Sequence, residues 1–172
     1  QLTPERIAAC GRLVEAAELV IADCNVPEAT LEAIAAMAAG KLLVEPVSVP
    51  KAAKLARLQE RHAVFLATPN LDQFRALGGS MGDVDSMRRT GRIRNIVIHQ
   101  GAAGATVLGE TGNRHVAAFP QLHVADVTGA GDAAVAGLAF GILRGYDLVR
   151  SALCGQAAAS LKLSSLQSTA EG

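Results

Sequence analysis

Aromatic side chains are scarce in this sequence: its 172 residues include four phenylalanines, one tyrosine and no tryptophan. Proteins that hold single-stranded nucleic acid commonly stack the bases on such rings, so a stacking platform is not expected. Sixteen basic residues balance sixteen acidic ones. This balance provides no strong attraction for nucleic acid or for an anionic membrane surface. We therefore expect neither nucleic acid nor a membrane among the partners.

Cysteines are few and widely spaced. Cys10, Cys24 and Cys154 are odd in number, and no Cys-x-x-Cys pair occurs, so we expect reduced, mostly buried thiols in a cytoplasmic protein. No uninterrupted apolar run reaches the ~18 residues that a membrane-spanning helix requires. The N-terminus, Gln-Leu-Thr-Pro-Glu-Arg, does not have the pattern of a signal peptide. It also lacks an initiating Met, which leaves open that the chain is a fragment.

Apolar residues make up half of the chain, and short apolar runs alternate with helix-like segments. The expected strands are residues 19–22, 42–44, 63–66 and 95–98. The expected helices are residues 3–17, 27–39, 51–59, 71–77 and 84–90. This alternation is typical of a parallel, doubly wound sheet with helices on both faces, here in a single α/β domain over residues 1–172. Such folds bind ligands at the carboxyl ends of the strands.

The pattern changes after Ile98. Residues 105–108 and 115–118 are expected to form a hairpin around Glu110-Thr111-Gly112-Asn113. A strand-like segment at 122–124 and an apolar helix at 133–143 follow, and a last helix covers residues 147–163. The second half of the chain is therefore expected to differ in architecture from the first.

The most informative stretch is Asp126-Val127-Thr128-Gly129-Ala130-Gly131-Asp132, at the start of the apolar helix. Gly129 and Gly131 allow backbone geometries, and a close approach to a ligand, that a side chain would block. The amides of Ala130, Gly131 and Asp132 are expected to be first-turn donors, and a helix N-terminus favours anions. A carboxylate beside a phosphate cradle is what a general base for phosphoryl transfer requires.

Two other interpretations of this stretch stay open. The glycines could serve only the packing of a helix start. Residues 129–134 also fit the dinucleotide fingerprint G-x-G-x-x-A, which would predict an NAD-dependent Rossmann oxidoreductase. That fingerprint should open a strand–helix–strand unit, whereas here a helix is followed by another helix. The P-loop pattern G-x-x-x-x-G-K-[ST] is absent.

The complete heptad before a helix of small residues resembles the C-terminal signature of the PfkB (ribokinase-like) carbohydrate and nucleoside kinases. Pro69-Asn70 after a strand, and the strand and glycine-spaced loop from Ile98 to Gly104, resemble further elements of that family. Glu45-Pro46-Val47-Ser48-Val49-Pro50-Lys51 resembles a segment of its pseudouridine-kinase-like branch. The resemblance covers the C-terminal part of the family's chain, a little more than half. It implies a three-layer, doubly wound, mostly parallel ribokinase-like fold that lacks the N-terminal strands and lid.

This resemblance also implies catalytic roles. Asp132 would take the proton from the substrate hydroxyl, as general base. The amides of Gly129, Ala130, Gly131 and Asp132 would form the anion hole for the transferring phosphate. General-base assistance typically contributes ~10²–10⁴ in rate.

Further roles concern cofactors. ATP and Mg²⁺ are implied, and so is a monovalent cation such as K⁺ at Asp126 and Thr128. Gly101 and Gly104 would lie along the nucleotide phosphates and ribose. Gln156 lies near the family's adenine pocket, with a packing role equally open. Asn70 would begin the family's Asn-x-x-Glu element, which is tied to Mg²⁺ and phosphate.

Several residues depart from the family pattern. Gln73 stands in place of the acid of Asn-x-x-Glu and supplies no negative charge, and Mg²⁺ prefers carboxylate, phosphate or water oxygens. His99 stands where many members have Thr or Ser, and it could equally be a structural histidine at a strand end. The other histidines are scattered without metal-ligand spacing. The basic run at Arg88, Arg89, Arg92 and Arg94 is interpreted as a solvated face.

We therefore expect an ATP-dependent phosphotransferase acting on a sugar or nucleoside hydroxyl, with pseudouridine favoured. The alternative is a non-catalytic nucleotide- or metabolite-binding fragment that is inactive without an N-terminal half. Without the strands that the family has upstream, a sheet edge would be exposed, and exposed edges favour pairing with other chains. The edge would then be covered by a second copy in a homodimer, by aggregation, or by the missing half.

Overall fold

The computed structural model describes residues 2–81, 93–110, 112–120 and 127–164. The chain divides into two compact units, which we describe separately: unit 1 is residues 1–98 with 108–110, and unit 2 is residues 99–107 with 111–172. The strands follow one another in the sheet in chain order, β1 to β6. They are Val20–Asp23 (β1), Leu42–Glu45 (β2), Val64–Ala67 (β3), Ile93–His99 (β4), Ala105–Gly109 (β5) and Gly112–Val116 (β6).

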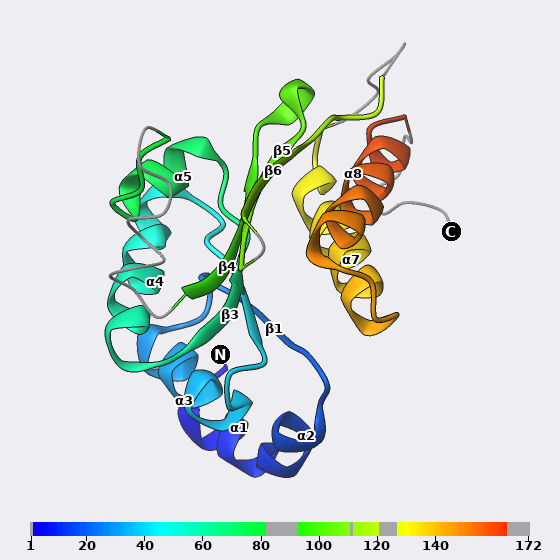
Figure 1. Ribbon diagram of the computed structural model, residues 1–172. Helices are drawn as coiled ribbons and strands as arrows, with labels where there is room; N and C mark the ends of the chain where they lie inside the picture. The colour runs from blue at the N-terminus through cyan, green and yellow to red at the C-terminus, as the bar shows by residue number, and fades with distance from the viewer. Residues whose placement is uncertain (1, 82–92, 111, 121–126, 165–172) are drawn as a thin grey trace. The chain divides into compact units, whose positions relative to one another are not determined.

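Unit 1 is built on parallel strands. β1 pairs with β2, β2 with β3 and β3 with β4, all parallel. Because crossovers between parallel strands are right-handed, strands that follow in chain order place their connecting helices on one face. Figure 1 shows α3, α4 and α5 together on one side of β3 and β4. The helices of this unit are Pro4–Ala9 (α1), Gly11–Ala16 (α2), Glu28–Ala38 (α3), Val49–Arg61 (α4) and Leu71–Ala76 (α5).

Aliphatic side chains from this sheet and its helices form the core of unit 1. Leu31 of α3, Leu55 of α4 and Phe74 of α5 are fully buried with strand residues such as Val44 and Ile96. β2 and β3 are short, apolar and almost entirely buried, which is the pattern of a buried parallel sheet, whereas β1 exposes Ile21 and Asp23. The burial explains why short apolar runs identify these strands in the sequence.

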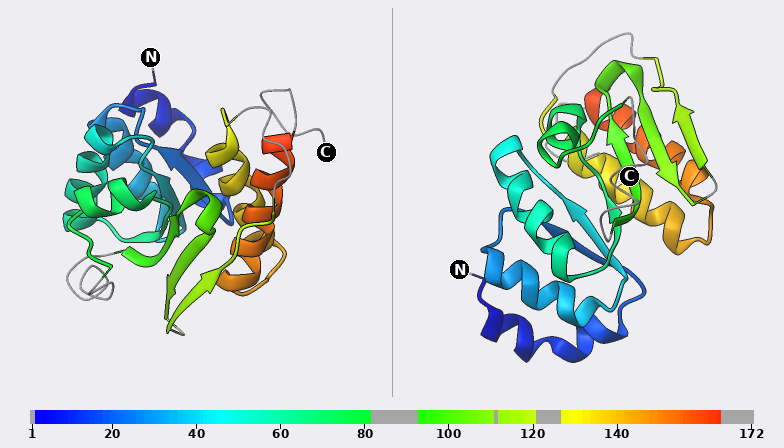
Figure 2. Two further views of the ribbon diagram at one scale, coloured as in Figure 1. Left: turned by 90° about the horizontal axis from the view of Figure 1, so that it is seen from above. Right: turned by 60° about the vertical axis from the view of Figure 1, so that its left-hand side comes forward.

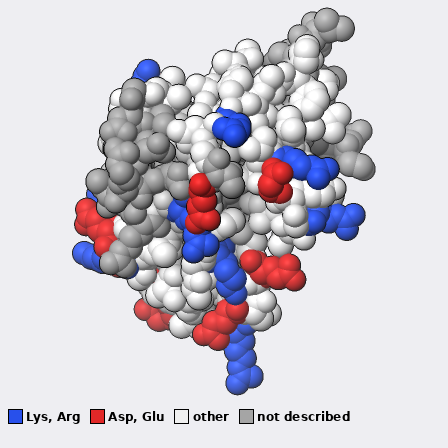
Figure 3. Space-filling view, in the orientation of Figure 1, with Lys and Arg blue, Asp and Glu red and all other residues white. Residues whose placement is uncertain are grey.

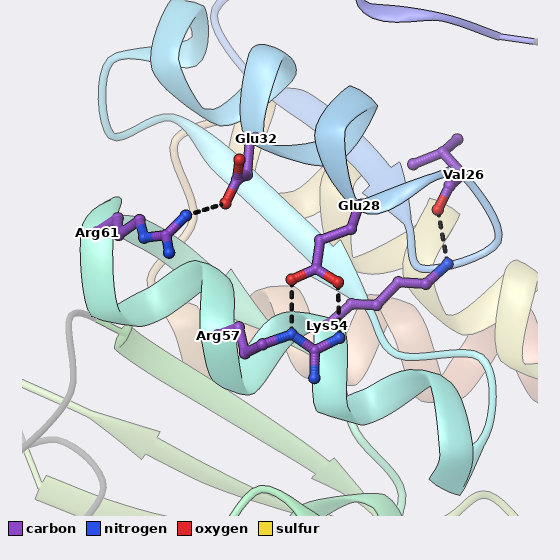
Figure 4. Close-up of polar contacts among 6 residues, drawn as sticks. All are labelled: Val26, Glu28, Glu32, Lys54, Arg57 and Arg61. Atoms are coloured by element: carbon purple, nitrogen blue, oxygen red, sulfur yellow. Dashed lines mark hydrogen bonds and ion pairs between the residues drawn. The ribbon is translucent and has the colours of Figure 1, made fainter.

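Charged side chains connect α3 to α4 at the surface of unit 1 (Figure 4). The guanidinium of Arg57 donates two hydrogen bonds of 2.6 Å to the carboxylate of Glu28. Arg61 donates to Glu32 at 2.7 Å. The ammonium of Lys54 donates to the carbonyl oxygens of Val26 and Cys24, at 2.7 and 2.9 Å. The two helices are therefore joined at the tips of long side chains.

The loop between β2 and α4 contains a strained residue. Val47 has φ of +66°, a left-handed conformation that is rare for a β-branched side chain. The amide of Ser48 donates to the carbonyl of Pro46 at 2.7 Å, which closes a tight turn around Val47. The loop belongs to the Glu45–Lys51 segment. The segment is thus ordered by a local turn that costs conformational energy.

Unit 2 contains a hairpin and two long helices. Its helices are Ala130–Leu143 (α7) and Leu148–Ser164 (α8), and a short 3₁₀ turn covers Gly101–Ala103. Figures 1 and 2 both show α7 and α8 side by side. Glycines set their separation: a Cβ added at Gly137 would lie 2.5 Å from the carbonyl oxygen of Cys154, and one at Gly155 would lie 2.7 Å from that of Ala134. The backbones therefore approach more closely than side chains would permit.

Most of the predicted elements are confirmed, with shifted ends. The helix expected over residues 3–17 is divided in two at Cys10, whose backbone has φ of −100° and ψ of 11°. The helix expected at 27–39 ends at Ala38, because Ala39 already adopts a left-handed conformation before Gly40. The helix expected at 84–90, the strand-like segment at 122–124 and three of the four arginines of the basic run lie outside the described residues.

The surface of the described residues carries both signs of charge. On the face drawn in Figure 3, basic and acidic side chains lie interspersed among uncharged ones. Within the described ranges, we find no helix with the length and apolar character needed to cross a membrane.

Candidate active site

The N-terminus of α7 presents the heptad's glycines and its last acid. Gly129 is the N-cap and has φ of +78°, which a side chain would disfavour. Its carbonyl accepts the amide of Ala133 at 2.9 Å, while the amide of Ala130 donates to Val127 at 3.3 Å. The amides of Gly131 and Asp132 belong to the first helical turn, where no intrahelical acceptor exists. The helix thus begins three residues before the expected Ala133.

Asp132 is the third residue of α7 and is exposed. It is also the only charged residue of that helix. A carboxylate in the first turn is stabilised by the positive end of the helix dipole. Exposure leaves the carboxylate accessible to a substrate hydroxyl. Its position is therefore compatible with proton transfer to a group that lies at the helix start.

A turn that contains Gly101 and Gly104 connects β4 to β5. The amide of Gln100 donates to the carbonyl of Gly104 at 2.8 Å, and the amide of Gly104 donates to Gly101 at 2.9 Å. Gly101 has φ of +58° with open space where a Cβ would be, so its backbone conformation requires glycine. Gly104 is required by packing as well, because a Cβ there would lie 2.1 Å from the carbonyl oxygen of Val116.

These two glycine segments line one pocket, which lies wholly within unit 2 and has a volume of about 690 Å³. That volume is within the range of small-molecule sites. Most of the lining is apolar, as such sites usually are. The lining residues are His99, Gly101, Ala102, Gly104, Ala118, Phe119, Pro120, Val127, Ala130, Gly131, Ala134, Gln156, Ala159, Ser160 and Leu163.

Two polar side chains in this pocket are deeply placed. Gln156 of α8 is only 7% exposed. The Nε2 atom of His99 is buried and has no hydrogen-bond partner among the described residues. Burial lowers the pKa of His99 below its usual 6.5, because desolvation disfavours the charged imidazolium. The imidazole is therefore neutral at pH 7.

The structure groups some of the predicted site residues and separates others. Five of them line the pocket of unit 2: Gly101, Gly104, Ala130, Gly131 and Gln156. Asp132, Gly129 and Thr128 belong to the same unit but are outside the pocket lining. Asn70 belongs to unit 1. Asp126 lies outside the described residues.

The Asn70–Gln73 pair forms a reciprocal cap at the start of α5. The amide of Gln73 donates to Oδ1 of Asn70 at 2.9 Å, and the amide of Asn70 donates to Oε1 of Gln73 at 2.8 Å. This is a capping box, which Glu and Gln support equally. Gln73 is 4% exposed. Its one acceptor oxygen is thus used for the backbone.

This arrangement does not fit a divalent cation. Mg²⁺ is usually bound through one or two carboxylates with phosphates and water, and Gln73 provides an amide already in use. Within the described ranges, no group of three or more His, Cys, Asp or Glu side chains is placed to hold a metal ion. Thr128 is exposed on the surface of unit 2.

The chain has clear relatives. The matching family is the pfkB family carbohydrate kinases, over residues 1–171. The chain belongs to this family. It is 30% identical over 172 residues to the pseudouridine kinase of Escherichia coli strain K12, a match that covers 95% of this chain and 54% of that protein. The chain therefore spans about half the length of this relative.

Solved structures of the family confirm the ribokinase-like fold. The adenosine kinase of Sinorhizobium meliloti matches with a TM-score of 0.85 at 17% identity, covering 98% of this chain and 55% of that one. The ribokinase of Arabidopsis thaliana, solved with ribose and ATP, matches with a TM-score of 0.76 at 17% identity, covering 92% and 54%. The family match over residues 1–171 confirms the resemblance to the PfkB family inferred from the heptad.

The sequence interpretation missed part of the pocket. Residues 118–120 carry no motif, and they line the pocket only because the chain passes Gly104 there. Four lining residues of α8 do have a signal, since their spacing of three and four residues places them on one helical face. They are Gln156, Ala159, Ser160 and Leu163.

Proposed function

We propose that this chain carries the nucleotide-binding and catalytic portion of a kinase that transfers the γ-phosphoryl group of ATP to a hydroxyl of a sugar or nucleoside. Membership of the pfkB family supports this class of reaction. The observation that carries the proposal is that the start of α7, which bears Asp132, and the Gly101–Gly104 turn line one pocket with Gln156. Unit 2 could then bind the phosphates and the nucleobase of ATP and also accept the proton of the substrate hydroxyl.

The roles follow from the chemistry of each segment. The apolar part of the pocket would hold the nucleoside of ATP, and Gln156 would offer it hydrogen bonds. The glycine backbones would allow the phosphates to approach, and the first-turn amides of Gly131 and Asp132 would donate to them. Phosphoryl transfer depends mainly on such positioning and charge stabilisation.

Asp132 would act as the general base. As the substrate oxygen forms its bond to the γ-phosphorus, its proton passes to the Asp132 carboxylate. The bond between the γ-phosphorus and the bridging oxygen breaks, and ADP leaves with that oxygen. Atoms and charge balance without any further reactant.

Pseudouridine is the substrate we favour. Two observations support it: the similarity to a pseudouridine kinase and the Glu45–Lys51 segment, whose turn at Val47 is held by a local hydrogen bond. A phosphorylation screen over ribose, common nucleosides and pseudouridine checks this choice. Phosphate transfer to pseudouridine above the others is the expected outcome, and preference for a free sugar would overturn the substrate while leaving the reaction class intact.

Replacing the base tests the reaction. In the full-length protein, Asp132→Asn is expected to bind ATP with near-normal affinity and to lose about 10²–10⁴ in turnover. Asp147→Asn is the matched control, because Asp147 accepts the amide of Arg150 at the start of α8 and asparagine can do the same. Near-normal turnover of Asp132→Asn would refute the assignment of the base.

A second candidate function is nucleotide or metabolite binding without catalysis. The observation that favours it is Gln73, whose amide replaces the family's acid and is used in the α5 cap. This alternative predicts ATP binding by calorimetry with no phosphorylated product in the substrate screen. Product formation that depends on Asp132 would exclude it.

A further inference from the structure

Gly155 of α8 contacts α7 at a point closer in sequence to Asp132 than the other interhelical glycines do. A Cβ built on Gly155 would lie 2.7 Å from the carbonyl oxygen of Ala134. Ala134 follows Asp132 by two residues, so both belong to one helical turn. The contacts at Gly137 and Gly141 lie further along α7. The contact at Gly155 is therefore the one that bears directly on the turn that carries Asp132.

The same contact joins two walls of the candidate pocket. Ala134 and Gly131 line the pocket from α7, and Gln156, which directly follows Gly155, lines it from α8. Gly155 is buried and Ala134 is 2% exposed, so the contact belongs to the packed interior of unit 2. The separation of the two walls is thus set where one backbone meets the other.

This contact leaves no room for an added methyl group. Ordinary van der Waals contact begins at 3.4 Å, so a Cβ at Gly155 would require the Ala134 carbonyl oxygen to move by about 0.7 Å. A backbone oxygen cannot rotate away as the end of a flexible side chain can. The oxygen is fixed in the helix, so α7 has to move with it. The start of α7, with Asp132, would then move away from α8.

We propose that Gly155 is a positioning residue for phosphoryl transfer: the absence of a side chain lets α8 reach the backbone of α7 and so fixes the Asp132 carboxylate relative to the nucleotide. The inference rests on the proposed kinase function, in which Asp132 is the base. Gly155 itself touches no reacting atom. It acts through the turn from Gly131 to Ala134, which it holds at a set distance from Gln156.

Turnover should be more sensitive to a displacement of α7 than ATP binding is. The phosphates of ATP are joined by single bonds and can follow the first-turn amides of the helix. The Asp132 carboxylate has to come within about 2.6–3.2 Å of a hydroxyl on a second, separately bound molecule. A misplacement of about 1 Å can cost roughly 10²-fold in rate. Moving α7 should therefore lower kcat more than it raises the KM for ATP.

Gly155→Ala in the full-length protein tests this role. Its kcat should fall about tenfold to hundredfold, while the dissociation constant of ATP from calorimetry stays within about threefold of wild type. Gly141→Ala is the matched control, because its Cβ would lie 2.6 Å from Cα of Ser151 in the same helix pair, nine residues after Asp132. The melting temperatures of both variants should fall to a similar extent. The kcat of Gly141→Ala should stay within about threefold of wild type, whereas a merely structural role would leave both kcat values alike.

A double substitution shows whether the effect passes through the base. In the Asp132→Asn background, Gly155→Ala should lower the residual kcat by less than about threefold, because the group that it misplaces is already gone. Equal reductions in both backgrounds would overturn the action through Asp132. Unchanged kcat in Gly155→Ala, or loss of ATP binding by this variant, would overturn the positioning role. Absence of phosphate transfer by wild type would instead overturn the proposed function.

Discussion

The two helix pairs of this chain are held together in opposite ways. In unit 1, α4 carries five charged residues, and four of them reach α3 or the segment just before it. In unit 2, α7 has a single charged residue. The two helices of this unit contact each other at Gly137, Gly141 and Gly155. One contact is made by the tips of long side chains and the other by backbones.

This difference has a consequence for tolerance to change. Exposed ion pairs contribute little to stability and can rearrange, so the α3–α4 contact should tolerate substitution. Backbone contact at a glycine cannot rearrange, because the added atom meets a carbonyl oxygen. The candidate pocket is lined by α7 and α8. The helix pair that serves the site is thus also the one with the least freedom.

The largest effect should come from filling the α7–α8 contact. Gly137→Ala places a Cβ 2.5 Å from the carbonyl oxygen of Cys154, and such overpacking typically costs about 1–3 kcal/mol. For a protein of this size, each kcal/mol lowers the melting temperature by roughly 2–4 °C. Calorimetric melting measures the loss. Gly131→Ala is the control in the same helix, because nothing lies within 4 Å of its added Cβ, and its melting temperature should be equal or higher. Equal melting for both variants would contradict the close contact.

A smaller effect should follow from breaking the α3–α4 contact. Glu28→Gln removes the carboxylate that Arg57 holds, and the melting temperature should fall less than in Gly137→Ala. The hydrogen bond from Arg57 is the main cause of the lowered pKa of Glu28. A carboxyl with a lowered pKa stabilises the fold above its ordinary pKa of 4.5, and this stabilisation is lost as pH falls through the lowered value. The difference between wild type and variant should therefore vanish in strong acid and in high salt. A loss as large as that of Gly137→Ala would contradict the comparison.

The smallest effect concerns thiol reactivity in unit 1. Burial, with the Glu45 charge as the next cause, raises the pKa of Cys24 to about 12, so the reactive thiolate is scarce at pH 8. Iodoacetamide should modify exposed Cys10 and leave Cys24 unmodified in the folded protein, as mass spectrometry would show. Lys54→Met removes a positive charge that lowers the pKa of Cys24, so the thiolate should become scarcer still and Cys24 should stay unmodified. Rapid labelling of Cys24 in wild type would contradict its burial.

The fold was largely predictable because its signals are local. Short apolar runs mark β1 to β3, and the helices expected from residues 27 and 51 begin in the structure at Glu28 and Val49. The division at Cys10 also has a local signal, since Gly11 follows it directly and glycine is a poor helix former, but the continuous helix expected over residues 3–17 did not take it into account. Gly101 and Gly131 were recognisable by their spacing. The buried, unpartnered nitrogen of His99 was not, because the burial of an atom depends on which residues the fold brings around it.

The cap at the start of α5 also bears on how this chain could change over generations. Glutamine and glutamate codons differ by a single base, and both side chains can return an oxygen to the amide of Asn70. Gln73→Glu would therefore introduce the family's acid without dismantling the cap. Either side chain can serve the structural role of residue 73, so a single base change could add a negative charge at this position while the cap is kept.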